Sequence, residues 1–147
     1  NSDTFAEVPG PTGLVRSQVM RTGAGAIRLP INLAPPTAPI PRRHIAVRVD
    51  DVRLAAHRAK DRGLPLLALP LNYFEDLRAR FALDDEFIAE LRELNLFYDR
   101  DEKGEFLHLY THTLDGVFFE LVERRDRYDG YGAANAAVRM AAQSHGA

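Results

Sequence analysis

The chain has 147 residues, a formal net charge of -2 and no cysteine, and 46% of its residues are hydrophobic. This length and composition are typical of a globular protein with a buried core, and the mixed charges exclude a basic surface for nucleic acid. The apolar runs are too short to cross a membrane, and disulfides and thiolate metal sites are excluded. The N-terminus has no signal-peptide pattern, which fits a cytoplasmic protein.

The N-terminal third of the chain is predicted to hold a loop, a β-hairpin and a linker. Residues 1–13 are rich in Pro, Gly and polar residues, which is typical of a loop. Imperfect alternation over 13–22 and a second apolar run over 26–34 predict two strands around a Gly-rich turn. The four prolines of 35–41 predict an extended linker and an internal boundary.

From residue 43 onward, the pattern predicts further strands and helices. The predicted strands are 43–49, 64–70, 96–101, 105–113 and 117–125, and the predicted helices run from a cap at Asp50 or Asp51 to Gly63, then over 73–81, 84–95 and 134–143. This order predicts an α+β fold built from a βαβββ unit, in which a mixed sheet forms half of an open barrel with helices outside it.

One acidic residue, Glu120, interrupts the apolar strand 117–125. Period-2 alternation places Phe118, Glu120 and Val122 on one face, and the opposite face is apolar as well. A buried carboxylate without a partner is unfavourable, so Glu120 requires an arginine, a lysine or a metal ion beside it. The alternatives are a buried ion pair or a position on an edge strand.

His44 is the candidate partner, because it opens the first strand of the unit whose last strand carries Glu120. These two strands can lie close together in a half-barrel. Two imidazoles and one carboxylate are the ligands of many non-haem Fe(II) sites, which leave coordination positions open for oxygen and substrate. His44 and Glu120 are therefore two candidate metal ligands, and packing or capping is the alternative role of His44.

The other histidines have less specific settings. His108 lies between two leucines and shares a strand face with Tyr110, which suggests a position in a cavity. His112 lies near a turn and is expected to be solvated. His57, on a charged helix, and His145, near the C-terminus, are expected at the surface.

Several segments follow one another in an order that resembles a known family. They are RHIAVRVDDV, NYFEDLRARF, HLYTHTLDGVFFELVERR and GYGAAN. Together they resemble the C-terminal half of 4-hydroxyphenylpyruvate dioxygenase, a member of the vicinal oxygen chelate superfamily. The resemblance is strongest to the dioxygenase-like half that is fused to bacterial 3-dehydroshikimate dehydratases.

This resemblance implies the βαβββ modules of the glyoxalase/dioxygenase fold. Residues 1–40 would be the end of a first module whose start is missing. Residues 41–147 would be a second module with a helical insertion and a C-terminal gate helix. The missing start would precede residue 1, and in the dehydratase alternative an N-terminal barrel domain would precede that.

The resemblance also implies roles for individual residues. His44 and Glu120 would bind Fe(II), or another divalent metal such as Mg, Mn, Co or Zn. The implied substrate-binding residues are Ser17, Asn32, His108, Tyr110 and Tyr131. His108 stands where the family has a glutamine, and Ala136 where it has a phenylalanine, which implies a different substrate or a looser gate.

One ligand of the family has no counterpart, because no histidine precedes His44 in this chain. Either the protein has lost the site or the chain omits residues. With a complete site, the resemblance implies oxidative decarboxylation of a small 2-oxo acid. A homodimer is a possible assembly, and no nucleic-acid or membrane partner is expected. The alternatives are an accessory half of a 3-dehydroshikimate dehydratase without dioxygenase activity, or a glyoxalase-type metal lyase. The lyase is disfavoured because 26–34 carries no carboxylate.

Overall fold

The computed structural model describes residues 2–10, 13–23, 27–33 and 43–145. The chain divides into two compact units, Asn1–Pro41 and Arg42–Ala147. No helix within the described ranges is both long enough and apolar enough to cross a membrane.

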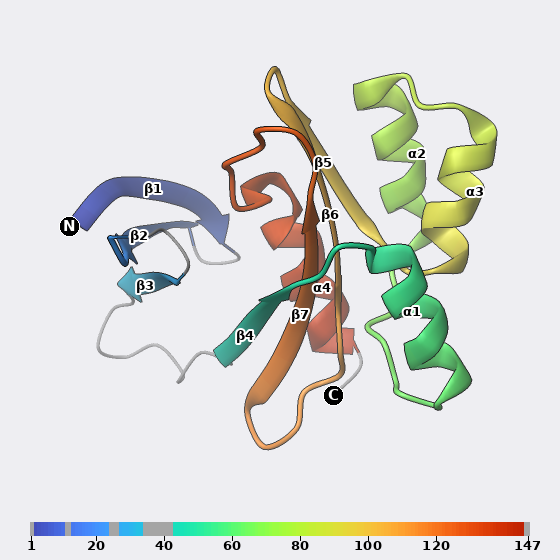
Figure 1. Ribbon diagram of the computed structural model, residues 1–147, viewed down its shortest axis with the longest axis horizontal. Coiled ribbons are helices and arrows are strands. Elements are labelled where there is room, and N and C mark those ends of the chain that lie inside the picture. The colour runs from blue at the N-terminus through green and yellow to red at the C-terminus, as the bar shows by residue number, and fades with distance from the viewer. Residues whose placement is uncertain (1, 11–12, 24–26, 34–42, 146–147) are drawn as a thin grey trace. The chain divides into compact units, whose positions relative to one another are not determined.

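The first unit contains a three-stranded antiparallel sheet in the order β1-β2-β3 (Figure 1). Its strands are β1 (Ser2–Gly10), β2 (Gly13–Arg21) and β3 (Arg28–Leu33). The predicted hairpin is confirmed as β2 and β3, which place Ser17 opposite Asn32. The predicted linker at 35–41 lies outside the described residues.

The loop predicted for residues 1–13 is wrong, because Ser2–Gly10 forms β1. Its residues pair with β2 over a long register that includes Val8 opposite Val15 and Pro9 opposite Leu14. Proline and glycine disfavour a central strand, but β1 lies at an edge of its sheet, where one side of the backbone needs no partner. Pairing with β2 thus outweighs the weak strand propensity of this segment.

The second unit is α+β, as predicted, and it follows the order β, α, β, β, β with two extra helices inserted. Its elements are β4 (Arg43–Arg48), α1 (Val52–Asp61), α2 (Leu71–Phe81), α3 (Asp85–Glu93), β5 (Phe97–Asp101), β6 (Gly104–Tyr110), β7 (Val117–Arg124), the 3-10 helix η1 (Ala133–Asn135) and α4 (Ala136–His145). The sheet order is β4-β7-β6-β5. The β4 strand runs parallel to β7, and the other pairs are antiparallel.

The strand predicted at 64–70 is wrong. Only Leu66 forms a bridge, with Thr111, and the Leu67 amide donates to the Tyr110 carbonyl at 2.8 Å. Pro65 and Pro70 lack the amide hydrogen that a longer ladder requires. The segment therefore crosses the end of β6 as an irregular connection, and β5, β6 and β7 complete the unit.

Helix α1 shows how the local sequence sets an element boundary. The Asp51 carboxylate accepts a hydrogen bond from the Leu54 amide at 2.9 Å, so Asp51 is the N-cap. The helix ends before Gly63, whose φ of 68° suits a residue without a side chain.

The core of the second unit lies against both faces of its sheet. Helices α1, α2 and α3 lie together on one side (Figure 1), and apolar residues from them and from the sheet form one cluster, which includes Val52, Phe74, Leu91, Leu107 and Leu109. Alternation along β6 places His108 and Tyr110 on the opposite face from these leucines. That second face is covered by η1 and α4, and it carries the site described below.

Candidate functional site

Glu120 lies at the centre of β7 and is almost completely buried, with 6% of its surface exposed. Phe118 and Val122 on the same face are buried too, which confirms the predicted alternation. Glu120 is paired with Ala46 on β4 and with Tyr110 on β6. The carboxylate is therefore flanked by the two strands that carry the histidines of interest.

Each oxygen of the Glu120 carboxylate faces a different imidazole. Oε1 lies 2.8 Å from Nδ1 of His108, whose side chain is 1% exposed. Oε2 lies 3.3 Å from Nε2 of His44, whose side chain is 33% exposed. The carboxylate thus connects a fully buried histidine to one that solvent and small ligands can reach.

These contacts decide the ionisation of Glu120. Burial alone would raise the pKa of the carboxyl group, but the contacts with His108 and His44 outweigh burial and hold the pKa well below its ordinary value. Glu120 is consequently a carboxylate at neutral pH, which is the form that binds a divalent metal.

Aromatic rings line the site. The Tyr110 ring stands nearly perpendicular to the rings of His44 and His108, at centroid distances of 6.2 and 5.3 Å. Phe118 stacks on His44 at 5.2 Å, and the Arg139 guanidinium lies 5.6 Å from the Phe118 ring centroid. Burial and the nearby Glu120 carboxylate raise the pKa of Tyr110 well above its ordinary value, so its hydroxyl stays neutral.

The second nitrogen of His108 contacts a buried amide. His108 Nε2 lies 3.1 Å from Nδ2 of Asn135, which is 1% exposed. Asn135 in turn contacts the Tyr73 hydroxyl and the Tyr98 carbonyl, both at 3.1 Å. A buried polar chain therefore runs from Glu120 through β6 to η1, α2 and β5.

Asn135 and Tyr73 contribute to the site but are not among the residues predicted from the sequence. Asn135 had a usable signal, since it is a polar residue among alanines at the start of an apolar helix. Tyr73 had none, because it lies 62 residues before Asn135 and reads as an ordinary core tyrosine.

The remaining predicted residues are placed as follows. Ser17 and Asn32 are opposite each other in β2 and β3, and their side chains are outside the described structure. Tyr131 is partly buried just before η1. Substrate contacts by these residues, by His108 and by Tyr110 stay predictions. His57 and His112 are exposed, as expected.

The chemistry of the donors partly fits the implied metal. An imidazole and a carboxylate from adjoining strands suit Fe(II) and other divalent ions. His108 does not add a third ligand, because its two nitrogens face Glu120 and Asn135. No group of three or more His, Cys, Asp or Glu side chains in the described part of the chain is arranged to hold a metal ion. The described residues thus supply two donors, and a complete site needs another.

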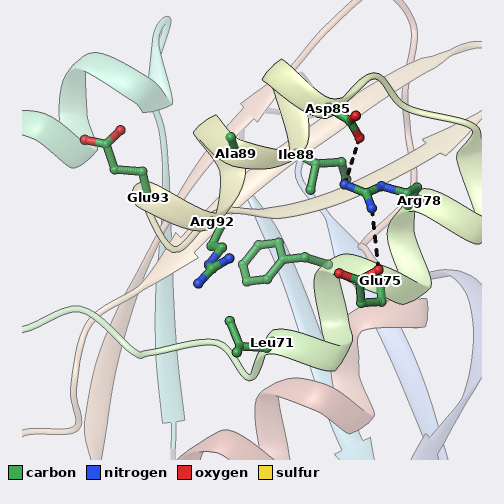
Figure 2. A pocket seen from close by; sticks show the side chains of 9 residues that line it. Leu71, Glu75, Arg78, Asp85, Ile88, Ala89, Arg92 and Glu93 are labelled. Atoms are coloured by element: carbon green, nitrogen blue, oxygen red, sulfur yellow. Dashed lines mark ion pairs between the residues drawn. The ribbon is translucent and has the colours of Figure 1, made fainter.

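A groove of about 480 Å³ lies elsewhere, on the helical insertion. Figure 2 shows its lining side chains from α2 and α3, with Arg78 pairing with Asp85 at 2.8 Å and with Glu75 at 3.6 Å. These charged groups are exposed, and the groove shares no residue with the surroundings of Glu120. Exposed ion pairs of this kind contribute little to the free energy of unfolding. Because its lining is separate from the residues around Glu120, the groove is no part of the candidate site.

Comparison with known sequences gives two sets of relatives, although no protein-family model matches. The chain is 42% identical to 3-dehydroshikimate dehydratase of Pseudomonas putida, over 97% of the chain and 25% of that protein. It is 33% identical to 4-hydroxyphenylpyruvate dioxygenase of Pseudomonas aeruginosa, over 84% of the chain and 38% of that protein. The chain thus spans about a quarter of the dehydratase's length.

Solved structures give the same picture. One solved structure is a fusion protein of a xylose isomerase-like TIM barrel and 4-hydroxyphenylpyruvate dioxygenase. The alignment covers 97% of this chain and 25% of the fusion protein's chain, with a TM-score of 0.83 and 41% identity. A variant of 4-hydroxymandelate synthase from Streptomyces coelicolor shares the fold, with a TM-score of 0.80 and 24% identity, over 99% of the chain and 46% of its own. The chain is therefore homologous to parts of 3-dehydroshikimate dehydratase and 4-hydroxyphenylpyruvate dioxygenase, and it has the fold of a dioxygenase-like domain.

Proposed function

We propose that this chain carries part of the metal site of a non-haem Fe(II)-dependent, dioxygenase-like domain that acts on a small 2-oxo acid. The observation that carries the proposal is the Glu120 carboxylate, which is buried, ionised and directed at His44 across adjoining strands. An ionised carboxylate beside a partly exposed imidazole is a suitable pair of donors for a divalent cation. The homology to 4-hydroxyphenylpyruvate dioxygenase supports the same reading.

Side chains around the pair suit an anionic aromatic or aliphatic oxo acid. Tyr110 and Phe118 provide apolar walls, and Arg139 provides a cation over the same two rings. A bound Fe(II) would supply the chelation of the oxo acid and the activation of oxygen. The part of the protein is to hold the ligands, to exclude water and to orient the acid.

Metal binding by a full-length protein that contains this domain tests the proposal, because the described residues supply only two donors. Fe(II) is added without oxygen, excess metal is removed, and metal content and affinity are measured, followed by oxygen uptake with a panel of 2-oxo acids. We expect Glu120→Ala and His44→Ala to weaken metal binding by more than about 100-fold, since loss of a direct ligand exceeds the effect of losing an outer partner. His112→Ala, which removes an exposed histidine, is the control. Failure of the wild-type full-length protein to bind any divalent metal would contradict the proposal.

A second function is favoured by the homology to 3-dehydroshikimate dehydratase. The domain would then be an accessory region of a larger dehydratase, and Glu120 would serve folding or ligand binding only. This reading expects dehydratase activity of a protein containing the domain to be unchanged by Glu120→Ala. It also expects no oxygen uptake with any oxo acid.

A further inference from the structure

The hydrogen-bond chain behind Glu120 has a direction that the backbone sets. The Tyr98 amide, which can only donate, lies 2.8 Å from the Tyr73 hydroxyl oxygen. That oxygen therefore accepts, and the Tyr73 hydroxyl is left to donate to Asn135 Oδ1 at 3.1 Å or to the Tyr98 carbonyl at 3.3 Å.

The Tyr98 carbonyl then fixes the orientation of the Asn135 amide. This carbonyl can only accept, and Asn135 Nδ2 lies 3.1 Å from it. The reversed amide would place two carbonyl oxygens at this distance with no hydrogen between them, which is unfavourable in a buried site. The NH₂ group of Asn135 consequently faces both the Tyr98 carbonyl and His108 Nε2.

The tautomer of His108 follows from the same logic. Because Nε2 accepts from Asn135, the ring proton is on Nδ1, which lies 2.8 Å from Glu120 Oε1. Every member of the chain is buried, with exposed fractions between 0 and 6%. Water therefore does not compete for these groups.

We propose that His108 is a positioning residue, held as its Nδ1-H tautomer by Tyr73 and Asn135, and that it fixes Glu120 through Oε1 so that Oε2 alone faces His44. The part of this inference that concerns a metal rests on the proposed function, and it makes Glu120 a ligand through one oxygen. The packing agrees, because Phe106 stacks on the His108 ring at 4.5 Å. A side chain at Gly132 would come within 3.2 Å of Nε2, so glycine leaves room for the amide contact.

Nitrogen NMR of the metal-free chain with ¹⁵N-labelled histidine tests the tautomer. His108→Gln assigns the signals, and the wild type is expected to show a protonated Nδ1 and an unprotonated Nε2. Asn135→Leu removes the donor to Nε2 and should shift the Nε2 signal, whereas Gln143→Leu, which changes a buried amide on α4, should leave that signal in place. A wild-type His108 protonated on Nε2 would overturn the inference.

Cobalt(II) titration of the full-length protein that contains this domain tests the positioning of Glu120. His108→Leu removes the donor to Oε1 and is expected to weaken Co(II) binding by about 10- to 100-fold, as loss of an outer partner commonly does. His108→Gln retains a donor and should bind within a few-fold of wild type. Equal binding by His108→Leu and wild type would refute positioning while leaving the proposed function intact. A full-length wild-type protein that binds no Co(II) or Fe(II) would refute the proposed function and the metal part of this inference. The NMR result would still test the hydrogen-bond network.

Discussion

Two glutamates on β7 have different roles, a candidate metal ligand and a structural hydrogen-bond acceptor, because their neighbours differ. Glu120 lies between two imidazoles, whereas Glu123, three residues further along and on the other face, is also buried. Glu123 Oε2 accepts a hydrogen bond from the Val52 amide at 2.9 Å, and Oε1 accepts one from Arg125 Nε at 2.6 Å. It thereby satisfies an amide at the first turn of α1, where a negative charge is favourable.

This contrast predicts a purely structural role for Glu123. Glu123→Leu leaves the Val52 amide without its acceptor and leaves Arg125 with Glu105 as its remaining acidic partner, so the free energy of unfolding should fall by roughly 2–4 kcal/mol. Glu123→Gln keeps one acceptor and should cost about 1 kcal/mol. Urea unfolding measures both values. Equal stability of the two variants, or weaker metal binding in Glu123→Gln, would contradict this separation of roles.

The sequence predicted the pairing of His44 with Glu120, because alternation assigns a face and the βαβββ order assigns neighbouring strands. It did not predict that both oxygens of Glu120 are engaged. That arrangement depends on Asn135 and Tyr73, which meet His108 through η1 and α2. Contacts between residues so far apart follow from packing and leave no periodic signal in the chain.

At the scale of elements, Tyr128 connects the segment after β7 to the sheet through hydrogen bonds and ring stacking. Its hydroxyl donates to Asp99 on β5 at 2.6 Å and accepts from the Gly132 amide at 3.1 Å. Its ring stacks on Phe106 at 5.1 Å, with the two planes nearly parallel. These contacts hold the turn that brings Asn135 to His108.

The Tyr128 contacts predict a dependence of stability on alkaline pH. Burial and the hydrogen bond to Asp99 raise the pKa of Tyr128 above its unfolded value of about 10. Because the pKa of Tyr128 is higher in the folded state, the contribution of its hydroxyl to the free energy of unfolding is complete below pH 10. This contribution is lost as the pH rises further. Tyr128→Phe should be less stable than wild type at pH 8, and this difference should shrink by up to about 1.4 kcal/mol per pH unit above 10. Urea unfolding between pH 8 and 11.5 checks this, and a constant difference would show that the hydroxyl does not titrate as expected.

Element boundaries were predictable where one side chain sets them and less so where tertiary pairing does. Asp51 caps α1 and Asp84 caps α3 through local hydrogen bonds, so sequence spacing located both helices. The strand β1 depends on pairing with β2, and the failure of 64–70 to form a strand depends on its prolines. Pairing with a sheet partner therefore outweighs propensity in β1, whereas the missing amide hydrogens of the prolines prevent a ladder in 64–70.

At the scale of the whole molecule, the second unit has a hydrophobic core of its own. The members of the main buried cluster fall between Val52 and Phe118, and a smaller cluster comprises Phe106, Val122 and Tyr128. The donors to the candidate metal site, His44 and Glu120, are in this unit as well. Folding of the site therefore needs the core of this unit, and any further metal donor is a separate requirement.

This organisation predicts that residues 42–147 fold without the first unit. The separate fragment should unfold cooperatively in urea, because its core and its sheet are closed within it. A peptide of residues 1–41 should be largely unfolded, since chains of about 40 residues seldom bury enough apolar surface to be stable without disulfides or metal. Far-UV circular dichroism and urea titration of both fragments and of the whole chain make the comparison.

The tautomer of His108 in the fragment 42–147 should match that in the whole chain. The reason is that every member of the hydrogen-bond network Tyr98–Tyr73–Asn135–His108–Glu120 lies within residues 42–147. A fragment that has secondary structure but no cooperative transition would show that the core of the second unit is insufficient by itself.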